Sequence, residues 1–228
     1  MELTKKRIYE DIEEIRETIE CSKRKFSGPY KLFLGYGILQ AALLGFNVIG
    51  MVIWGANNET AYFNFAVGMI GAMITATLYF LLYRMEKKSS NRYYLVAIST
   101  WGIIAIAMPF LLFAARIAIM VRGQGAAVQT LQTLEEYKML VSILLVCVAM
   151  IMVGYITDKM SLLVTAVIVL LCFIVLRVLP ESSFLISVKE NVTLEITFSA
   201  LFYYIANIFG YIGLGMLLKY QEKKYGNI

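Results

Sequence analysis

The chain has 228 residues, of which 60% are hydrophobic and 16% are charged, and its formal net charge is +5. Soluble domains carry about a quarter charged residues, so this composition excludes an ordinary soluble globular domain. The sequence contains no histidine, which excludes nucleophiles activated by histidine and most zinc sites.

Long apolar runs dominate the sequence. A helix needs about 20 mostly apolar residues to cross the hydrocarbon core of a bilayer, and six such runs are present. We therefore predict an all-α polytopic membrane protein with a six-helix transmembrane bundle over residues 29–220. A cytosolic amphipathic helix over residues 1–28 precedes the bundle, and a cytosolic tail over 221–228 follows it. The predicted spans are 30–54, 61–83, 93–120, 139–156, 161–178 and 192–218.

The distribution of basic residues predicts that both termini lie in the cytosol. Lysine and arginine are retained on the cytosolic side of a membrane. Of the 21 such residues, the outward-facing pieces would hold only Arg116, Arg122, Lys138, Arg177 and Lys189. The positive net charge then reflects this topology and attraction to anionic headgroups. The expected partner is the lipid bilayer, and no nucleic-acid partner is expected.

The first predicted element is a helix over residues 3–26. Positions 8, 12, 15, 19, 22 and 26 are spaced alternately by four and three, which is the spacing of a coiled-coil seam, and all of them except Ser22 are apolar. The opposite face is acidic, whereas helices that lie on lipid usually have a basic polar face. The apolar stripe therefore favours a protein partner or a second copy of the chain, and packing against the protein's own cytosolic turns is the alternative. The stripe consists of Ile8, Ile12, Ile15, Ile19 and Phe26.

Gly28-Pro29 separates this helix from the first span, because the residue before proline avoids the helical conformation and proline suits a first helical turn. Small residues then recur every four positions in the first two spans. Such stripes allow membrane helices to approach closely. The two stripes are Gly37, Ala41 and Gly45 in the first span and Gly68, Ala72 and Ala76 in the second.

Polar residues inside the first and last spans are the candidates for a site. Gln40 and Asn47 lie two helical turns apart, and Asn207 lies near the middle of the last span. A polar side chain in lipid is costly and needs a partner. Two interpretations stay open: a polar pocket, if the two spans are neighbours, or interhelical hydrogen bonds of about 0.6 to 2 kcal/mol each. The candidate residues are Gln40, Asn47, Tyr203, Tyr204, Asn207 and Tyr211.

Later features concern the connections between spans. Pro109 predicts a kink in the third span. Residues 126–136 are expected to form a short separate helix, and residues 157–160 are too few to join the fourth and fifth spans except as an antiparallel hairpin. The outer segment 179–191 is expected to be a loop.

Several kinds of chemistry find no support in the sequence. No acidic residue lies at the centre of a span, which argues against a proton-coupled pump. There is no glycine-rich phosphate-binding loop with lysine and serine or threonine, which argues against an ATPase. Cys147 and Cys172 lie inside spans and Cys21 is predicted to be cytosolic, so no structural disulfide is expected. We expect no enzyme activity, no cofactor and no metal.

The opening of the chain resembles that of uncharacterised bacterial multispan membrane proteins that join an acidic amphipathic helix to a first span through a Ser-Gly turn. The likeness covers less than a fifth of the chain. It implies a bacterial plasma membrane (inner membrane) and no defined activity. The residues that carry it are Ile12, Ile15, Ile19, Ser22-Lys23, Phe26-Ser27-Gly28-Pro29-Tyr30 and Gly35-Tyr36-Gly37.

The sequence therefore favours a non-enzymatic integral membrane protein, an accessory or regulatory subunit that acts through its N-terminal helix and span packing. The expected partner is a protein or a second copy of the chain. In size and span number the chain also resembles permease subunits of ABC-2-type exporters. That alternative implies transport driven by a separate ATPase, with Gln40, Asn47 and Asn207 along the route.

Overall fold

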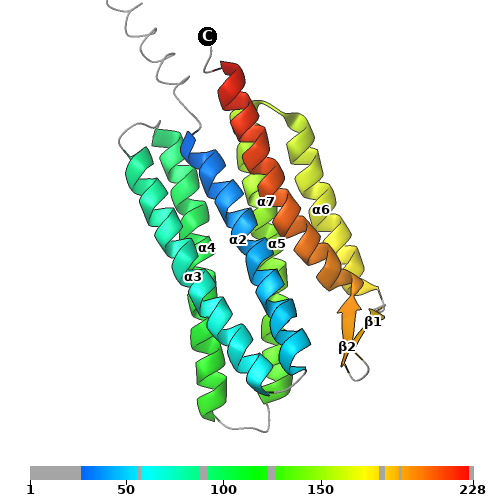
Figure 1. The fold of residues 1–228 in the computed structure, drawn as a ribbon. Helices are drawn as coiled ribbons and strands as arrows, with labels where there is room; N and C mark the ends of the chain where they lie inside the picture. The colour runs from blue at the N-terminus through cyan, green and yellow to red at the C-terminus, as the bar shows by residue number, and fades with distance from the viewer. Residues whose placement is uncertain are drawn as a thin grey trace, which may run out of the picture.

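The computed structural model describes residues 27–55, 58–87, 92–122, 127–179, 183–189 and 192–225. The predicted N-terminal helix and its apolar stripe lie outside these residues. The described part is a bundle of long helices with one β-hairpin at its side (Figure 1). The elements are α2 (Ser27–Trp54), α3 (Asn58–Glu86), α4 (Arg92–Arg122), α5 (Ala127–Thr157), α6 (Met160–Val178), β1 (Ser183–Lys189), β2 (Val192–Thr197) and α7 (Phe198–Tyr225).

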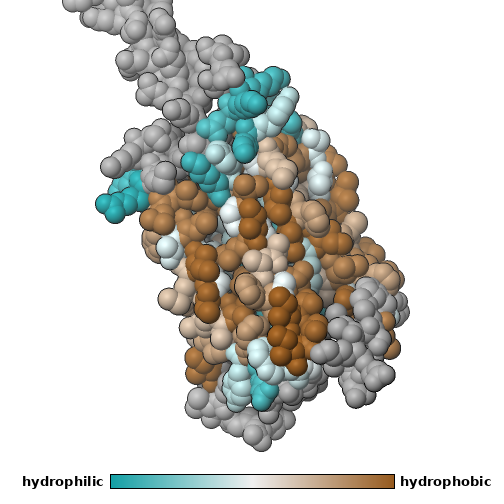
Figure 2. Space-filling view, viewed as in Figure 1, coloured by the Kyte–Doolittle hydropathy of each residue, from teal (hydrophilic) through white to brown (hydrophobic). Residues whose placement is uncertain are grey.

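The described helices are apolar on the outside of the bundle as well as inside. Six of them are long and apolar enough to cross a membrane, as the sequence predicted. Figure 2 shows a broad hydrophobic belt between hydrophilic ends. Large side chains such as Phe80, Leu171 and Phe209 are more than half exposed. An apolar surface of this extent is typical of a protein that contacts lipid rather than water.

Five helices form a ring. In the order of their contacts, α2 packs against α7, α7 against α5, α5 against α4, α4 against α3, and α3 against α2. The first and last spans are thus neighbours. Helix α6 lies outside the ring against α5 and α7, where the buried Cys147 thiol donates a hydrogen bond to the Ala166 carbonyl oxygen over 3.3 Å. We call the end that holds the start of α2 and the end of α7 the terminal end (top of Figure 1), and the opposite end the distal end.

Two glycines bring α2 and α7 into close contact. A Cβ atom added at Gly37 would lie 2.9 Å from the backbone nitrogen of Ile212, and one added at Gly215 would lie 2.8 Å from that of Leu34. Only glycine permits these approaches. Gly45 and Gly68, which the sequence placed in the same small-residue stripes, have nothing within 4 Å of an added Cβ. The close contact therefore involves only part of the predicted stripes.

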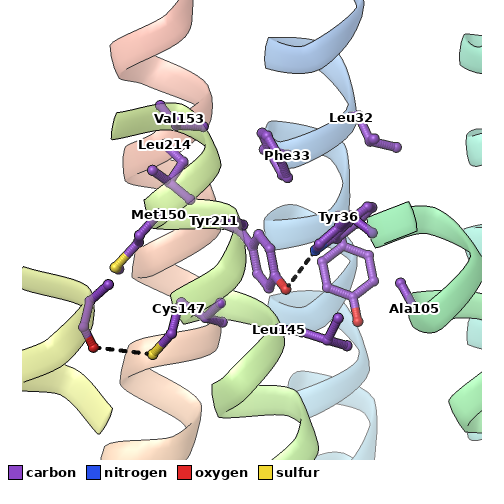
Figure 3. Close-up of a cluster of buried hydrophobic side chains, with 14 of the residues drawn as sticks. Leu32, Phe33, Tyr36, Ala105, Leu145, Cys147, Met150, Val153, Tyr211 and Leu214 are labelled. Atoms are coloured by element: carbon purple, nitrogen blue, oxygen red, sulfur yellow. Dashed lines mark hydrogen bonds between the residues drawn. The ribbon is translucent and has the colours of Figure 1, made fainter. Parts of the chain in front are cut away.

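Aromatic side chains fill the ring in its terminal half (Figure 3). Trp101 packs edge-on against Phe33 and Tyr36, with ring centroids 5.3 and 5.2 Å apart. Tyr36 also packs edge-on against Tyr211 at 4.7 Å. The geometry is the edge-to-face arrangement that aromatic pairs prefer. We call Phe33, Tyr36, Trp101 and Tyr211 the aromatic cluster; all four residues are buried.

The prediction that the last span begins at residue 192 is wrong. Residues 192–197 form β2, which pairs antiparallel with β1, for example Ser183 with Thr197 and Ile186 with Leu194. Apolar and polar residues alternate in Val192–Thr197, and this segment is rich in β-branched residues, which suits a strand. The described part of the chain is therefore helical with one added β-hairpin. Helix α7 begins at Phe198 and continues to Tyr225, so residues 221–225 of the predicted tail are helical.

Other boundaries also differ from the sequence prediction. The short helix expected at residues 126–136 is the first part of α5, which is continuous from Ala127 to Thr157. Helix α4 is continuous through Pro109. The predicted α5–α6 hairpin is confirmed by the contacts of the two helices. Asp158 makes the turn with a positive φ of 52°, a conformation that aspartate tolerates better than most residues.

Candidate functional site

A pocket of about 180 Å³ lies inside the ring, toward the distal end, between α2, α3, α4, α5 and α7. Its walls are largely apolar and include Leu43, Leu44, Phe65 and Leu112. Polar side chains are interspersed among them. The polar lining residues are Tyr36, Gln40, Asn64, Thr75, Lys138, Tyr203 and Tyr204.

Small residues of α3 form part of the pocket wall. Gly68, Gly71 and Ala72 all line it, and the space beside Gly68 is open because nothing lies within 4 Å of an added Cβ there. Two aromatic rings of the lining, Phe65 of α3 and Phe113 of α4, pack against each other with their centroids 4.1 Å apart. The small residues that the sequence placed in a packing stripe thus partly serve to leave a cavity.

The polar side chains of the pocket come from four helices, α2, α3, α5 and α7. On α2, Tyr36 and Gln40 lie one turn apart and their side chains share a hydrogen bond. On α7, the rings of Tyr203 and Tyr204 are 5.0 Å apart. On α5, Lys138 is the polar residue that lines the pocket. The Thr75 hydroxyl is already used, because it donates to the Gly71 carbonyl oxygen over 2.9 Å.

Charged side chains are sparse in the lining of the pocket. Lys138 is the charged residue among those that line it, and the lining includes no aspartate or glutamate. Lys138 is also exposed, which places its ammonium group toward the outside rather than deep in the ring. Toward the terminal end the pocket meets the aromatic cluster, since Tyr36 belongs to both.

The structure brings together only some of the candidates from the sequence. Gln40, Tyr203 and Tyr204 line the pocket. Tyr211 belongs to the aromatic cluster, where it accepts a hydrogen bond from Trp101. Asn207 is buried and its Nδ2 donates to the Tyr203 carbonyl oxygen of its own helix over 3.0 Å.

Asn47 does not line the pocket. Its Oδ1 atom is buried with no hydrogen-bond partner, and the same is true of Asn64 Oδ1 on the facing helix α3. The Oδ1 atom of Asn64 lies 3.5 Å from the position that a Cβ atom added at Gly50 of α2 would take. Asn64 therefore lies at the α2–α3 contact.

Sequence reasoning overlooked Asn64, Thr75 and Lys138 as pocket residues. Asn64 could have been found by the same test that selected Asn47, a carboxamide inside an apolar run. Lys138 was assigned only to the outward-facing basic residues. The participation of Tyr36 could not have been found, because nothing in the local sequence separates it from the other tyrosines.

A second polar contact joins α5 to α6. Arg177 Nη2 lies 3.0 Å from Glu136 Oε1, with 26% and 56% of the two side chains exposed. Within the described ranges, no group of three or more histidine, cysteine or carboxylate side chains is placed to hold a metal ion.

Comparison with known proteins adds no relative. No protein-family model, no curated protein and no solved structure matches this chain. A function for the chain must therefore be argued from its own residues.

Proposed function

We propose that this protein is a non-enzymatic, multi-pass subunit of the bacterial plasma membrane that regulates or assists a partner. In this proposal both termini lie in the cytosol, and the apolar stripe of the N-terminal helix binds a protein partner or a second copy of the chain. The observation that supports it best is the position of α2. The N-terminal segment leads directly into α2, which packs against both α3 and α7.

The α2–α7 contact would let a partner act on the bundle as a whole. Gly37 and Gly215 bring the two backbones close together, and Phe33 and Tyr36 of α2 pack into the aromatic cluster. Tightly packed interiors move as units rather than deforming gradually. A partner that binds the N-terminal helix and pulls on it would therefore tilt α2 together with α7.

Packing in the terminal half favours this role over transport. Trp101 and Tyr211 are each 1% exposed and fill the ring beyond Tyr36, where the pocket ends. The permease alternative still has one supporting observation, because Gln40 lines a pocket within the ring. Asn47 and Asn207, the other residues proposed for that route, are not among the residues that line it.

The test is affinity purification of the intact chain from its native membrane in mild detergent, with mass spectrometry and light scattering. We expect a self-oligomer or a partner protein that is lost when residues 2–26 are deleted. A sharper variant replaces Ile8, Ile12, Ile15 and Ile19 by serine. Its matched control replaces Glu10, Glu13 and Glu17 on the opposite face by glutamine.

Loss of the partner in the isoleucine variant and retention in the glutamate variant would support the proposal. Recovery of a nucleotide-binding ATPase in fixed ratio, unaffected by the isoleucine replacements, would contradict it and support the permease alternative. Recovery of the chain as a monomer without partners would contradict both.

A further inference from the structure

We propose that a groove along α3, at the terminal end of the bundle, binds one anionic phospholipid. An acyl chain lies in the groove, and the phosphate lies between Lys31 of α2 and Arg84 of α3. The inference is independent of the proposed partner-binding role, because this groove and the N-terminal stripe share no residues.

The walls of the groove suit a hydrocarbon chain. The groove has a volume of about 510 Å³, within the range of about 300 to 1,000 Å³ that is usual for ligand pockets. It opens to the outside of the bundle, where Met73 and Leu81 are each 60% exposed. The hydroxyl group of Thr77 is already used, because it donates to the Met73 carbonyl oxygen over 2.9 Å. The lining residues are Lys31, Met73, Ile74, Thr77, Leu78, Leu81 and Leu82.

Two basic residues belong to the terminal end of this groove. Lys31 lines it from α2. Arg84 lies in the last turn of α3. It follows Thr77 by seven residues and Leu81 by three, and residues at these spacings share one face of a helix. The face of α3 that lines the groove therefore continues to the Arg84 position.

The two basic residues also lie at similar heights along the bundle. A Cβ atom added at Gly35 of α2 would lie 3.0 Å from Leu78 Cδ1 of α3, which fixes the register of the two helices. Toward the terminal end, Lys31 is four residues from Gly35 and Arg84 is six residues from Leu78. With a rise of about 1.5 Å per residue, their heights differ by about 3 Å. One phosphate group can therefore lie between the two long side chains.

Both charges are available to a lipid headgroup. The two side chains are exposed, and within the described part of the chain neither of them forms an ion pair. The Lys31 ammonium lies 5.8 Å from the centroid of the Tyr30 ring, a contact that leaves its charge in place. Lysine and arginine bind phosphate through charge-assisted hydrogen bonds. Because headgroups lie at the membrane surface, such a site needs cations on the outside of the bundle, as these are.

A second groove shows the opposite arrangement of charge. It has a volume of about 270 Å³, lies between α5 and α6, and is lined by both Glu136 and Arg177. Arg177 Nη2 is 3.0 Å from Glu136 Oε1, so the two charges compensate each other. We therefore expect the groove at Lys31, and not this one, to select an anionic lipid over a zwitterionic one.

The charge is tested by a double variant, Lys31→Gln with Arg84→Gln. Its matched control is Lys219→Gln with Lys223→Gln, which removes the same number of exposed positive charges from the last turns of α7. The end of α7 lies at the same end of the bundle (Figure 1), and neither lysine lines the groove. A general attraction of basic residues to anionic lipid would affect both double variants equally.

The groove itself is tested by Thr77→Phe, which places a ring where the acyl chain would lie. Thr165→Phe on α6 is the matched control. Thr165 is also exposed, and its hydroxyl group makes the same kind of bond, to the Ser161 carbonyl oxygen over 2.8 Å. All the substituted positions are exposed, so each variant should keep the unfolding midpoint of the parent chain within a few degrees, and this is checked before lipid is added.

The experiment is native mass spectrometry of the full chain, purified in detergent, stripped of lipid and titrated with phosphatidylglycerol or phosphatidylcholine of identical acyl chains. We expect the first phosphatidylglycerol to bind at least tenfold more tightly than the first phosphatidylcholine. The Lys31 and Arg84 double variant should reduce this preference to less than twofold. Thr77→Phe should weaken the first phosphatidylglycerol at least tenfold. Both controls should bind as the parent chain does, and free glycerol phosphate should not compete.

Four results would overturn the proposal. Equal binding of the two lipids, or an unchanged preference in the Lys31 and Arg84 double variant, would show that these charges do not select the headgroup. Unchanged binding in Thr77→Phe would show that no acyl chain lies in the groove. Competition by glycerol phosphate would assign the site to a soluble phosphate compound. A dimer that excludes lipid would show that a second copy covers the groove. The titration uses the purified chain alone, so it does not depend on which partner, if any, copurifies.

Discussion

The indole nitrogen of Trp101 donates a hydrogen bond to the hydroxyl oxygen of Tyr211 over 3.2 Å, and this bond joins α4 to α7 through the interior of the ring. The two rings also pack at 67°, with centroids 5.7 Å apart. Since α4 and α7 are not adjacent in the order of ring contacts, the pair ties opposite sides of the bundle together. The stability of the terminal half should therefore be sensitive to this one pair.

Tyr211→Phe should destabilise the protein by about 1 to 2 kcal/mol, because the buried Trp101 N–H loses its acceptor while the ring is kept. The measurement is the unfolding midpoint of the purified chain in detergent. Tyr220→Phe is the matched control, since Tyr220 is 65% exposed, and it should leave the midpoint unchanged. Equal midpoints for Tyr211→Phe and the parent chain would mean that the bond contributes nothing.

Gly37→Ala and Gly215→Ala should each destabilise by about 1 to 3 kcal/mol, because the added methyl group meets backbone atoms of the facing helix and forces the helices apart. Gly213→Ala and Gly45→Ala are controls with open space beside them. They should be neutral or stabilising by up to about 1 kcal/mol, because alanine is the better helix former. The same unfolding assay compares the stabilities of the four variants. The prediction fails if the stability changes of the Gly37 and Gly215 variants overlap those of the Gly213 and Gly45 controls.

Asn47→Leu should be neutral or stabilising, because its buried Oδ1 has no partner and an unpaired buried acceptor costs about 1 to 3 kcal/mol. Asn207→Leu should not stabilise the protein, since it removes the hydrogen bond that Asn207 Nδ2 donates to the Tyr203 carbonyl oxygen. Thermal unfolding of both variants provides the comparison. A clear loss of stability in Asn47→Leu would reveal a partner for that carboxamide, such as a bound molecule.

The proposed orientation places the β-hairpin outside the cell and the end of α7 inside. In a cysteine-free background, Leu185→Cys on β1, where the side chain is 70% exposed, should react in whole cells with a membrane-impermeant maleimide. Lys223→Cys on α7, also exposed, should react only after the cells are opened. The reverse pattern would invert the topology, and reaction of both sites in whole cells would contradict two cytosolic termini.

The number of long helices was predictable from the sequence because an apolar run of sufficient length is a property of consecutive residues. The start of α7 was not, although Val192–Thr197 alternates in polarity. That alternation sits directly before an apolar run, so a hydropathy argument joins the two. Pairing with β1, a contact between separate segments, is what stabilises the strand.

The candidate site was predictable only in part. Gln40 and Asn207 were chosen by the same criterion, yet Gln40 lines the pocket and Asn207 bonds to its own helix. Which of these happens depends on the rotation of each helix about its axis and on the side chains that face it. Neither is visible in a single apolar run, because in lipid both faces of a helix are apolar and periodicity carries little information.

The sequence by itself determined that the chain forms long apolar helices, how many there are, and that α5 and α6 form a hairpin, because length, hydropathy and a short connection act locally along the chain. Only the tertiary structure decided that five helices close into a ring with α6 outside it, that aromatic side chains fill one half, and that Lys138, Gln40 and Tyr203 meet around a pocket in the other. These outcomes depend on which small residues face which large ones across helices distant in sequence, and such matching exists only once the helices have packed.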